Sequence, residues 1–561
     1  MIPQDQNLIK LISGRQSTLE TAKTNFNDRM QEVADFVAPH REDIRGNLVK
    51  GLKKGTKIFD GTAVGAAVLA TDGIHGYHVS PAFPWFKYVM NRKKVNDLPE
   101  IKEWLEEVEF NMYMALNRSN FYSEAWSWIY DGFTLGTAPM YAEEDIAAGR
   151  IVFEAVHPGE AYIQENRYGE VDLMHRKMKR TVRWMVQRFG KENVGESLAR
   201  MYETAPFFEA EIIHAVFPRE EYDNRMKDAK NKKFASVWWI KTGNILAKIS
   251  GFDAFPAQVW RYMRNGKEPY GVSPANLSMS DIKGLNLMGK TLLGAAQLAV
   301  DPAYNVPSYL EGKTQLKPRG MNYVRDPGDR ISPVNTASNF PVGIDREQAK
   351  QRAIKERFHV DTFLMLAQLE GRGQRTAYEV SEMMAEKAAV LGAELGPLNT
   401  ELDHLLERVY DIEVAAGRMP RPPDVLLEMA GQDHALRFDP VYMGPLAQAQ
   451  REKFHKNGII KFFTEIAGIV QASPEALDNI DTDEAIRQLG DADNVPSSII
   501  RSKDDVDERR KTRQAAQAQQ AQMESLGQVA GIAKTGAQAD QATGGQLSQA
   551  ISGMTGDVNG A

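Results

Sequence analysis

Two helical segments on either side of a proline-rich insertion constrain the fold of this chain more than any other feature. Residues 276–300 repeat leucine, isoleucine and methionine at three- and four-residue spacing, which predicts a helix about 37 Å long. Residues 344–358 predict a second helix. The segment between them, 301–343, contains six prolines, so we expect it to be irregular or β-containing. The expected order is therefore a helix, a compact insertion and a second helix.

The rest of the sequence predicts a mixed fold, predominantly α with α/β parts. The chain to about residue 140 has helical periodicity. Between about residues 138 and 260, short apolar stretches alternate with Gly, Pro and Asn, which favours strands and hairpins. One helix is expected there, at Val182–Phe189, because Gly190 follows it.

Beyond the second helix, a polar stretch at Glu370–Arg375 leads into a long helical segment at 376–416. A β-like stretch at Asp424–Phe438 precedes helices between about residues 446 and 505. Residues 514–561 contain 11 Ala, 10 Gln and 8 Gly. Such a tail favours a fraying helix or disorder over a packed domain.

Composition excludes several classes of function. The chain has 561 residues with 68 Lys and Arg against 75 Asp and Glu, a net charge of −7, whereas tight nucleic-acid-binding domains are strongly basic. It has no cysteine, which excludes a disulfide scaffold, a thiolate zinc site and a cysteine nucleophile. Neither a secretory signal nor an apolar run of about 18 residues is found. We expect an intracellular or particle-borne protein without a membrane span.

Residues Gly284–Thr291 match the G-x-x-x-x-G-K-[ST] pattern of P-loop NTPases, whose backbone N–H groups and lysine bind phosphate. That chemistry requires a buried strand before the loop. Here the preceding residues resemble the start of a helix, and the apolar residues inside the pattern continue the helical periodicity. We favour small residues that allow close helix packing, with a P-loop NTPase as the alternative.

No other catalytic, cofactor or metal signature is present. The histidines are scattered, without an H-E-x-x-H pair. Asp481–Glu484 resembles a set of acidic metal ligands, but it directly precedes a helical segment, where Asp and Thr are natural caps. We therefore predict no enzyme activity, no cofactor and no metal.

Basic residues in and after the second helix are the candidate functional groups. Segment 344–358 has five basic and three acidic residues, a net charge of +2, and includes Lys350, Lys355 and Arg357. On a monomer such charges form a solvated face, whereas in a closed ring they repeat as a belt around the hole. Arg372 and Arg375 stand beside glycines, which suits either a mobile basic loop or a flexible connection.

Short landmarks spread over about residues 25–455 together resemble the portal, or head-to-tail connecting, proteins of short-tailed bacteriophages. None is specific alone, but their order and spacing match as a set. They include Arg29–Pro39, Ile58–Thr62, Ser80-Pro81, Trp85-Phe86, Ser119–Tyr122, Gly136-Thr137, Pro158–Glu160, Glu165-Asn166, Gly169, Trp260-Arg261, Tyr270-Gly271, Pro274, Thr376–Val380, Leu395–Pro397 and Gly444–Ala447.

The resemblance implies a viral portal fold that assembles as a ring, normally of twelve subunits, at one capsid vertex. Twelve helices packed at roughly 9 Å would enclose a hole of roughly 24 Å, enough for B-form DNA. The implied parts are a wing (1–275 and 376–445), a stem of two helices (276–300 and 344–358), a clip (301–343), a tunnel-loop region (359–375), a helical crown (446–505) and a partly disordered C-terminal tail or barrel (506–561).

The same resemblance implies a non-enzymatic channel for packaging and ejecting double-stranded DNA. The expected partners are other copies of the chain, the DNA, the terminase large subunit, a tail adaptor, and the major capsid and scaffolding proteins. The expected location is the virion, and the host cytoplasm during assembly. A structural scaffold or adaptor that does not contact DNA is a further alternative. The candidate DNA-channel residues are Lys350, Lys355, Arg357, Arg372 and Arg375.

Overall fold

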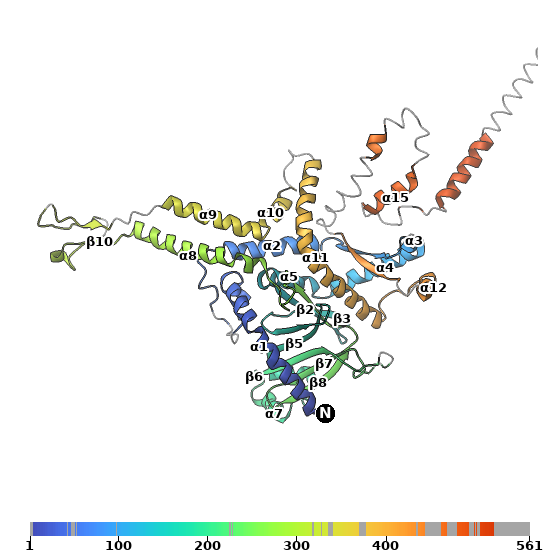
Figure 1. Ribbon diagram of the computed structural model, residues 1–561, viewed down its shortest axis with the longest axis horizontal. Helices are drawn as coiled ribbons and strands as arrows, with labels where there is room; N and C mark the ends of the chain where they lie inside the picture. The colour runs from blue at the N-terminus through green and yellow to red at the C-terminus, as the bar shows by residue number, and fades with distance from the viewer. Residues whose placement is uncertain are drawn as a thin grey trace, which may run out of the picture. The chain divides into compact units, whose positions relative to one another are not determined.

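The computed structural model divides the chain into two compact units, Met1–Gly458 and Ile459–Ala561. The sheets and the long helices belong to the first unit (Figure 1). The structure describes residues 4–41, 43–45, 51, 53–96, 98–223, 226, 228–316, 319–326, 328–334, 340–369, 377–432, 436–443, 462–467, 480–492, 499, 501 and 505–520.

Helices dominate the first part of the first unit, as the periodicity predicts. The carboxylate of Asp5 caps the first helix by accepting hydrogen bonds from the N–H groups of Asn7 and Leu8, at 2.9 and 3.3 Å. The fifth helix ends at Gly136, whose φ of +81° suits glycine. The elements are α1 (Gln6–Phe36), η1 (Pro39–Arg41), α2 (Thr62–His78), α3 (Lys93–Asn96), α4 (Pro99–Arg118) and α5 (Phe121–Leu135).

The predicted strand region forms two antiparallel sheets. The smaller has the order β3-β2-β9, with Met140 of β2 opposite Ala155 of β3. The larger has the order β4-β5-β6-β7-β8. The strands are β2 (Thr137–Asp145), β3 (Arg150–Ala155), β4 (Ala161–Glu165), β5 (Val171–Thr181), β6 (Glu209–Pro218), β7 (Phe234–Ile240), β8 (Ile245–Phe252) and β9 (Ala257–Arg261).

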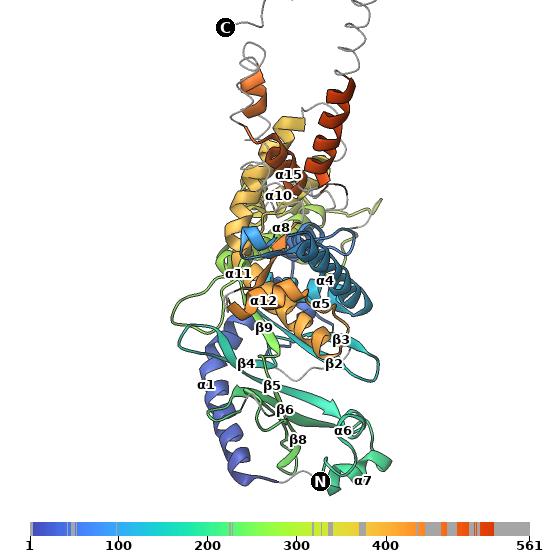
Figure 2. The same cartoon turned by 90° about the vertical axis from the view of Figure 1, so that its right-hand side faces the viewer.

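Helices cover both faces of the five-stranded sheet. Successive residues of a strand point to opposite faces. Ile212 and Trp238 accordingly pack against α6 (Val182–Phe189) and α7 (Glu196–Thr204). Their neighbours Ile213 and Trp239 pack against the first turns of α1. Figure 2 shows α1 on one side of this sheet and α6 and α7 on the other. Helix α6 has the bounds predicted from the sequence.

A large aromatic core joins the N-terminal helices to the three-stranded sheet. Trp85, Trp128 and Trp260 are fully buried in it, and the rings of Trp128 and Trp260 lie 6.1 Å apart. A Cβ at Gly132 would collide with the Trp260 ring, so glycine is required there. This core also takes in Leu285, near the middle of helix α8 (Pro274–Val300).

The predicted helix, insertion and helix are confirmed as α8, a short antiparallel hairpin and α9 (Phe340–Arg357). Ser273 caps α8 and forms a capping box with Asn276. In the insertion, β10 (Tyr304–Asn305) pairs with β11 (Ser332–Pro333), and η2 (Ser308–Leu310) lies between them. We call α8 and α9 the stem. Figure 1 shows the hairpin at its end.

The chain after the stem returns to the core. Helix α10 (Val360–Leu369) packs against α2, with Phe363 beside Gly73. The predicted long helix is confirmed as α11 (Ala377–Ala415). The described residues of 4–275 and 360–443 are called the body below.

The predicted β-like stretch at Asp424–Phe438 is wrong for most of its length. Residues Asp424–Gln432 form helix α12, whose sequence is rich in the helix formers Leu, Glu, Met and Ala. The strand β12 (Phe438–Tyr442) begins only at the end of the stretch and pairs with β1 (Phe86–Met90). Because that partner is distant in the sequence, local pattern does not locate the strand.

In the second unit, the described residues that were expected to be helical are helical at 462–467 and in α15 (Thr482–Ala492). The Asp481 carboxylate accepts a hydrogen bond from the Glu484 N–H at 2.9 Å, which confirms the capping interpretation. Among the described residues, no cluster of acidic or histidine side chains could hold a metal ion. No helix in the same part of the chain is long and apolar enough to cross a membrane.

Candidate functional site

Polar contacts hold the two stem helices together near the body. The Lys350 ammonium of α9 lies 3.0 Å from the Asp281 carboxylate of α8. Arg357 donates to the backbone carbonyl of Leu277 at 2.6 Å and lies 4.0 Å from Asp281. Two of the candidate cations are therefore partly neutralised within one subunit, where they join α9 to α8.

The residues of the P-loop pattern lie inside α8. Their backbone is therefore helical and cannot wrap a phosphate. A Cβ at Gly284 would lie 3.2 Å from the Lys350 amine, and one at Gly289 would lie 3.6 Å from the carbonyl oxygen of Phe59. Small residues thus let α9 and the loop before α2 approach α8, which confirms the packing interpretation and contradicts the P-loop one.

The loop before α2 anchors the stem from another side. The Asn286 side chain accepts hydrogen bonds from the N–H groups of Phe59 and Asp60, at 2.6 and 3.3 Å, and donates to the Lys57 carbonyl at 2.8 Å. Gln351 of α9 donates to the Asp60 carboxylate at 3.0 Å. One loop therefore fixes both stem helices, so the inner end of the stem is held on several sides.

The junction of stem and body gathers sequence landmarks that are far apart in the chain. The Ser273 hydroxyl donates to the Thr134 carbonyl at 2.6 Å, and the Gly271 N–H donates to the Thr137 hydroxyl at 2.8 Å. A Cβ at Gly136 would lie 2.7 Å from the Gly271 carbonyl oxygen, so these backbones could not meet with larger residues. The landmarks at 136–137 and 270–274 therefore fix where α8 leaves the body.

A buried lysine ties α1 to the loop before β4. Lys23 donates to the carbonyl oxygens of Pro158 at 2.5 Å and Ala161 at 2.6 Å. Its ammonium lies 4.6 Å from the ring centroid of Tyr162 and 5.5 Å from that of Tyr270. Burial lowers the pKa of Lys23 to about 7. Sequence reasoning missed this residue because a lysine on a helix is usually exposed, although its partners begin at the Pro158–Glu160 landmark.

A second buried charge fixes the segment after α1. The Asp131 carboxylate of α5 lies 2.8 Å from the Arg41 guanidinium. Burial raises the pKa of Asp131 to about 7, and Arg41 opposes that rise. This pair and Lys23 each join segments of the body that are far apart in the sequence.

The remaining channel candidates differ in what surrounds them. Lys355 is exposed on α9 and has no ion-pair partner among the described residues, and the same holds for its neighbour Arg352. Arg352 was not singled out as a candidate, because several cations share that helix. Arg372 and Arg375 lie outside the described residues, and their assignment stays a prediction.

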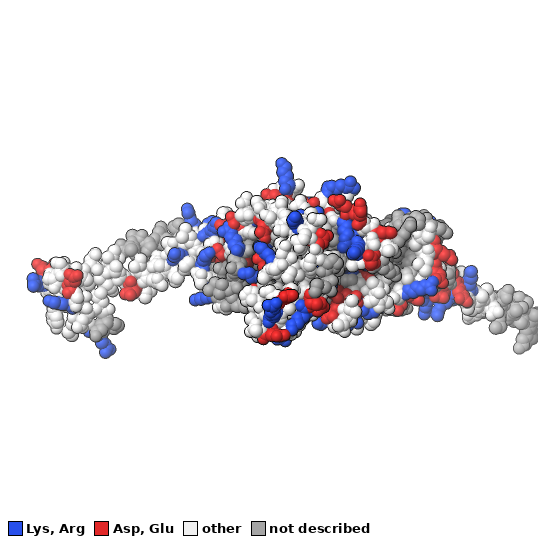
Figure 3. All heavy atoms as spheres, turned by 90° about the horizontal axis from the view of Figure 1, so that it is seen from below, with Lys and Arg blue, Asp and Glu red and all other residues white. Residues whose placement is uncertain are grey.

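The outer stem, residues 287–300 of α8, exposes large apolar side chains. Leu287 is 65% exposed and Val300 is 88% exposed, and Leu293 and Leu298 are about half exposed. Residues 291–300 carry no charged side chain. Figure 3 shows the shaft of the stem almost free of blue and red, whereas both colours are mixed over the body. An apolar surface of this kind marks a site of association.

Comparison with known proteins identifies the class. The family of bacteriophage head to tail connecting proteins matches residues 10–500. The portal protein of Salmonella phage epsilon15 is 30% identical over 517 residues, covering 89% of this chain and 90% of the relative. The probable portal protein of Bordetella phage BPP-1 is 28% identical over 528 residues, covering 91% and 92%.

Among solved structures, the virion of a native gene transfer agent particle aligns with a TM-score of 0.35 and 10% identity, over 77% of this chain and 90% of that one. The chain belongs to the bacteriophage head to tail connecting protein family. The resemblance predicted from the landmarks is confirmed, and with it the function of a portal, or head-to-tail connector.

Proposed function

We propose that twelve copies of this chain form a ring at one capsid vertex and that double-stranded DNA passes through it during packaging and ejection. The observation that carries the proposal is the apolar surface of the outer stem. A single subunit leaves these side chains in water, whereas neighbours in a ring would bury them. Burial of each Leu or Val would contribute about 1.5–3 kcal/mol.

The exposed residues fall on two faces of α8, as a closed ring requires. Leu287 and Leu298 are eleven residues apart, about three full turns, so they share one face. Leu293 and Val300 are seven residues apart and share a second face, about 140° from the first. In a ring each subunit contacts two neighbours through different surfaces. Each face would therefore meet one neighbour.

Within such a ring, the cations of α9 would supply a weak positive belt. Lys355 is the strongest candidate, with Arg352, because neither has an ion-pair partner among the described residues. Lys350 and Arg357 would contribute less, since Asp281 and the Leu277 carbonyl already bind them. Few free cations favour sliding DNA over tightly held DNA, because affinity grows with the number of phosphate contacts. Arg372 and Arg375 stay candidates for the tunnel loop.

The other parts follow the family. We propose that the hairpin segment at the end of the stem is the clip, which would bind the terminase large subunit and later the tail adaptor. The body without α10 would be the wing, facing capsid and scaffolding proteins. Helix α10 would belong to the tunnel-loop region, and the helices between residues 446 and 505 would form the crown. The ring itself would be non-enzymatic. No observation favours the P-loop NTPase or an adaptor that avoids DNA.

The proposal is tested by the native mass of the full-length protein with top-view electron micrographs. We expect a hollow ring of about 750 kDa, twelve times 62.8 kDa. A compact species that hydrolyses ATP would contradict the proposal.

The belt is tested by full-length DNA packaging with Lys355→Gln and Arg352→Gln together. We expect full-length DNA packaging to change in this double variant. We expect no change in the control pair on the body, Lys230→Gln with Lys267→Gln. Equal packaging by the two pairs would contradict the proposed belt, while the proposed ring would stand.

A further inference from the structure

Helix α4 presents an exposed stripe that neither the core nor the stem uses. Its buried side includes Trp104 and Val108. The adjacent exposed side carries Glu100, Glu103 and Glu107, followed by two large apolar residues. Phe110 is 64% exposed and Met114 is 51% exposed. Spacings of three and four residues place all five on one side of the helix.

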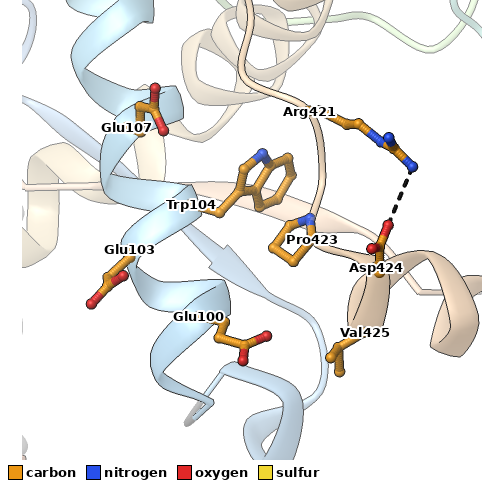
Figure 4. A pocket seen from close by; sticks show the side chains of 8 residues that line it. All are labelled: Glu100, Glu103, Trp104, Glu107, Arg421, Pro423, Asp424 and Val425. Atoms are coloured by element: carbon orange, nitrogen blue, oxygen red, sulfur yellow. Dashed lines mark hydrogen bonds and ion pairs between the residues drawn. The ribbon is translucent and has the colours of Figure 1, made fainter.

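The acidic end of this stripe borders a shallow groove of about 450 Å³. Figure 4 shows Trp104 and Pro423 facing one another, with Glu100 and Glu107 on the α4 wall to either side of Trp104. The opposite wall is the segment Arg421–Val425, at the start of α12. Val425 is about one-third exposed, so apolar surface continues onto α12.

The charge of the groove is uncompensated. Glu100, Glu103 and Glu107 have no ion-pair partner among the described residues. Arg421 is the single cation that lines the groove, and it already lies 3.2 Å from Asp424. The surface is therefore acidic at one end, apolar at the other, and open to a partner of opposite charge.

We propose that this face docks an amphipathic helix of a partner protein that carries Lys or Arg along one side. The stripe from Glu100 to Met114 covers fifteen residues and spans about 21 Å, which is the length of four turns of such a helix. Cations at its first turns would meet the three glutamates, and apolar residues further on would cover Phe110 and Met114. The inference does not depend on the DNA channel.

The position of the face suits a partner other than the one at the clip. Within the first unit, α4 and α12 lie away from the stem and its hairpin (Figure 1). A helix bound there would leave the stem free.

The test uses the full-length protein and a fluorescein-labelled amphipathic peptide of eighteen residues built from Lys and Leu. Binding is measured by fluorescence anisotropy at low and high salt. Glu103→Gln with Glu107→Gln is expected to weaken binding about five- to tenfold and to flatten its salt dependence. The matched control is Glu220→Gln with Glu221→Gln, which removes two exposed charges elsewhere on the body and is expected to leave affinity within about twofold.

Two further measurements distinguish binding at this face from nonspecific binding of the peptide. Carbodiimide coupling of the bound peptide is expected to join its lysines to Glu103 or Glu107, as mass spectrometry would show. Phe110→Ser with Met114→Ser is expected to weaken binding about threefold or more. Equal losses in the acidic and control pairs, or coupling at other sites, would overturn the proposal. Protection of the α4 carboxylates from carbodiimide in the assembled protein without peptide would also overturn the proposal. That result would mean that the face is a contact between subunits.

Discussion

The body and the outer stem have similar kinds of side chains but place them differently. In the body, Trp85, Trp128 and Trp260 are fully buried, and polar groups such as Lys23 have partners. In the outer stem, Leu287 and Val300 are mostly exposed. The body is therefore a domain that contains its own core, whereas the outer stem lacks one. The comparison teaches that one chain can hold a region with a buried core of its own and a region that leaves its apolar side chains exposed.

The largest expected effect is in the core of the body. Trp260→Ala removes a fully buried ring and leaves a cavity, so the free energy of unfolding is expected to fall by about 3–5 kcal/mol. All eight tryptophans lie between residues 85 and 260, so tryptophan fluorescence during urea denaturation reports on the body alone. Phe207→Ala, at a side chain 71% exposed, is the control. Equal losses in the two variants would refute a self-contained core.

The next effect concerns the buried lysine. Lys23→Met keeps the length of the side chain but leaves the carbonyls of Pro158 and Ala161 without their donor. We expect a loss of about 2–3 kcal/mol in the same urea experiment. Lys10→Met, on the exposed side of α1, is the matched control. An unchanged free energy of unfolding in Lys23→Met would mean that water replaces the ammonium as the hydrogen-bond donor.

The pH dependence of stability follows from the same group. Burial lowers the pKa of Lys23 to about 7 from its ordinary value of 10.5, so between these values the unfolded chain binds the extra proton. Stability contributed by this group is therefore expected to rise with pH from 7 to about 9, by about 1 kcal/mol per unit. Urea midpoints at pH 7, 8 and 9 should show a steeper rise in the wild type than in Lys23→Met. Parallel slopes would contradict the prediction.

A smaller effect is expected at the inner stem. Lys350→Met removes the ion pair with Asp281, whose two side chains are about one-third exposed, so the subunit should lose no more than about 1 kcal/mol. Because Asp281 is then left to Arg357, the double variant with Asp281→Asn should cost less than the sum of the single changes. Thermal unfolding of all three variants measures the coupling. Strict additivity would show that the pair does not act as one unit.

The smallest effect on the subunit is expected at the outer stem, where the effect on assembly is greatest. Leu287→Glu with Leu298→Glu changes exposed side chains, so the free energy of unfolding should shift by less than about 0.5 kcal/mol. Native mass should nevertheless show loss of the ring, because charges would enter the contact between neighbours. Ile146→Glu, 84% exposed on the body, is the control. If the double variant still forms a normal ring, this face of α8 is not an interface between subunits.

Local periodicity predicted the longer helices because helix signals need only neighbouring residues, but it missed α7 and assigned α12 to a β-like stretch. The bounds of α6 and the order of α8, hairpin, α9 and α11 follow from it. Strand β12 could not be located, since its partner β1 is distant in the sequence. The P-loop pattern was correctly set aside, because the residues before Gly284 already indicated a helix.

The candidate site was only partly predictable. Sequence placed Lys350, Lys355 and Arg357 on one helix, but it could not show that Asp281 and the Leu277 carbonyl bind two of them. Those contacts join segments about 70 residues apart, across the insertion. Lys23 was missed for the same reason, since its acceptors lie in a loop more than 130 residues later.

The uneven bracing of the stem has a mechanical consequence. The polar links between α8 and α9 that involve Leu277 and Asp281 lie within the first turns of α8, and Asn286 and Lys290 anchor α8 to the loop before α2. Each stem then resembles a beam clamped at one end, with a long free arm. In the proposed channel, a side load on the free arm would place its largest bending moment at the clamped inner end, where these contacts lie. In the proposed ring, contacts between adjacent arms would distribute the strain among the subunits.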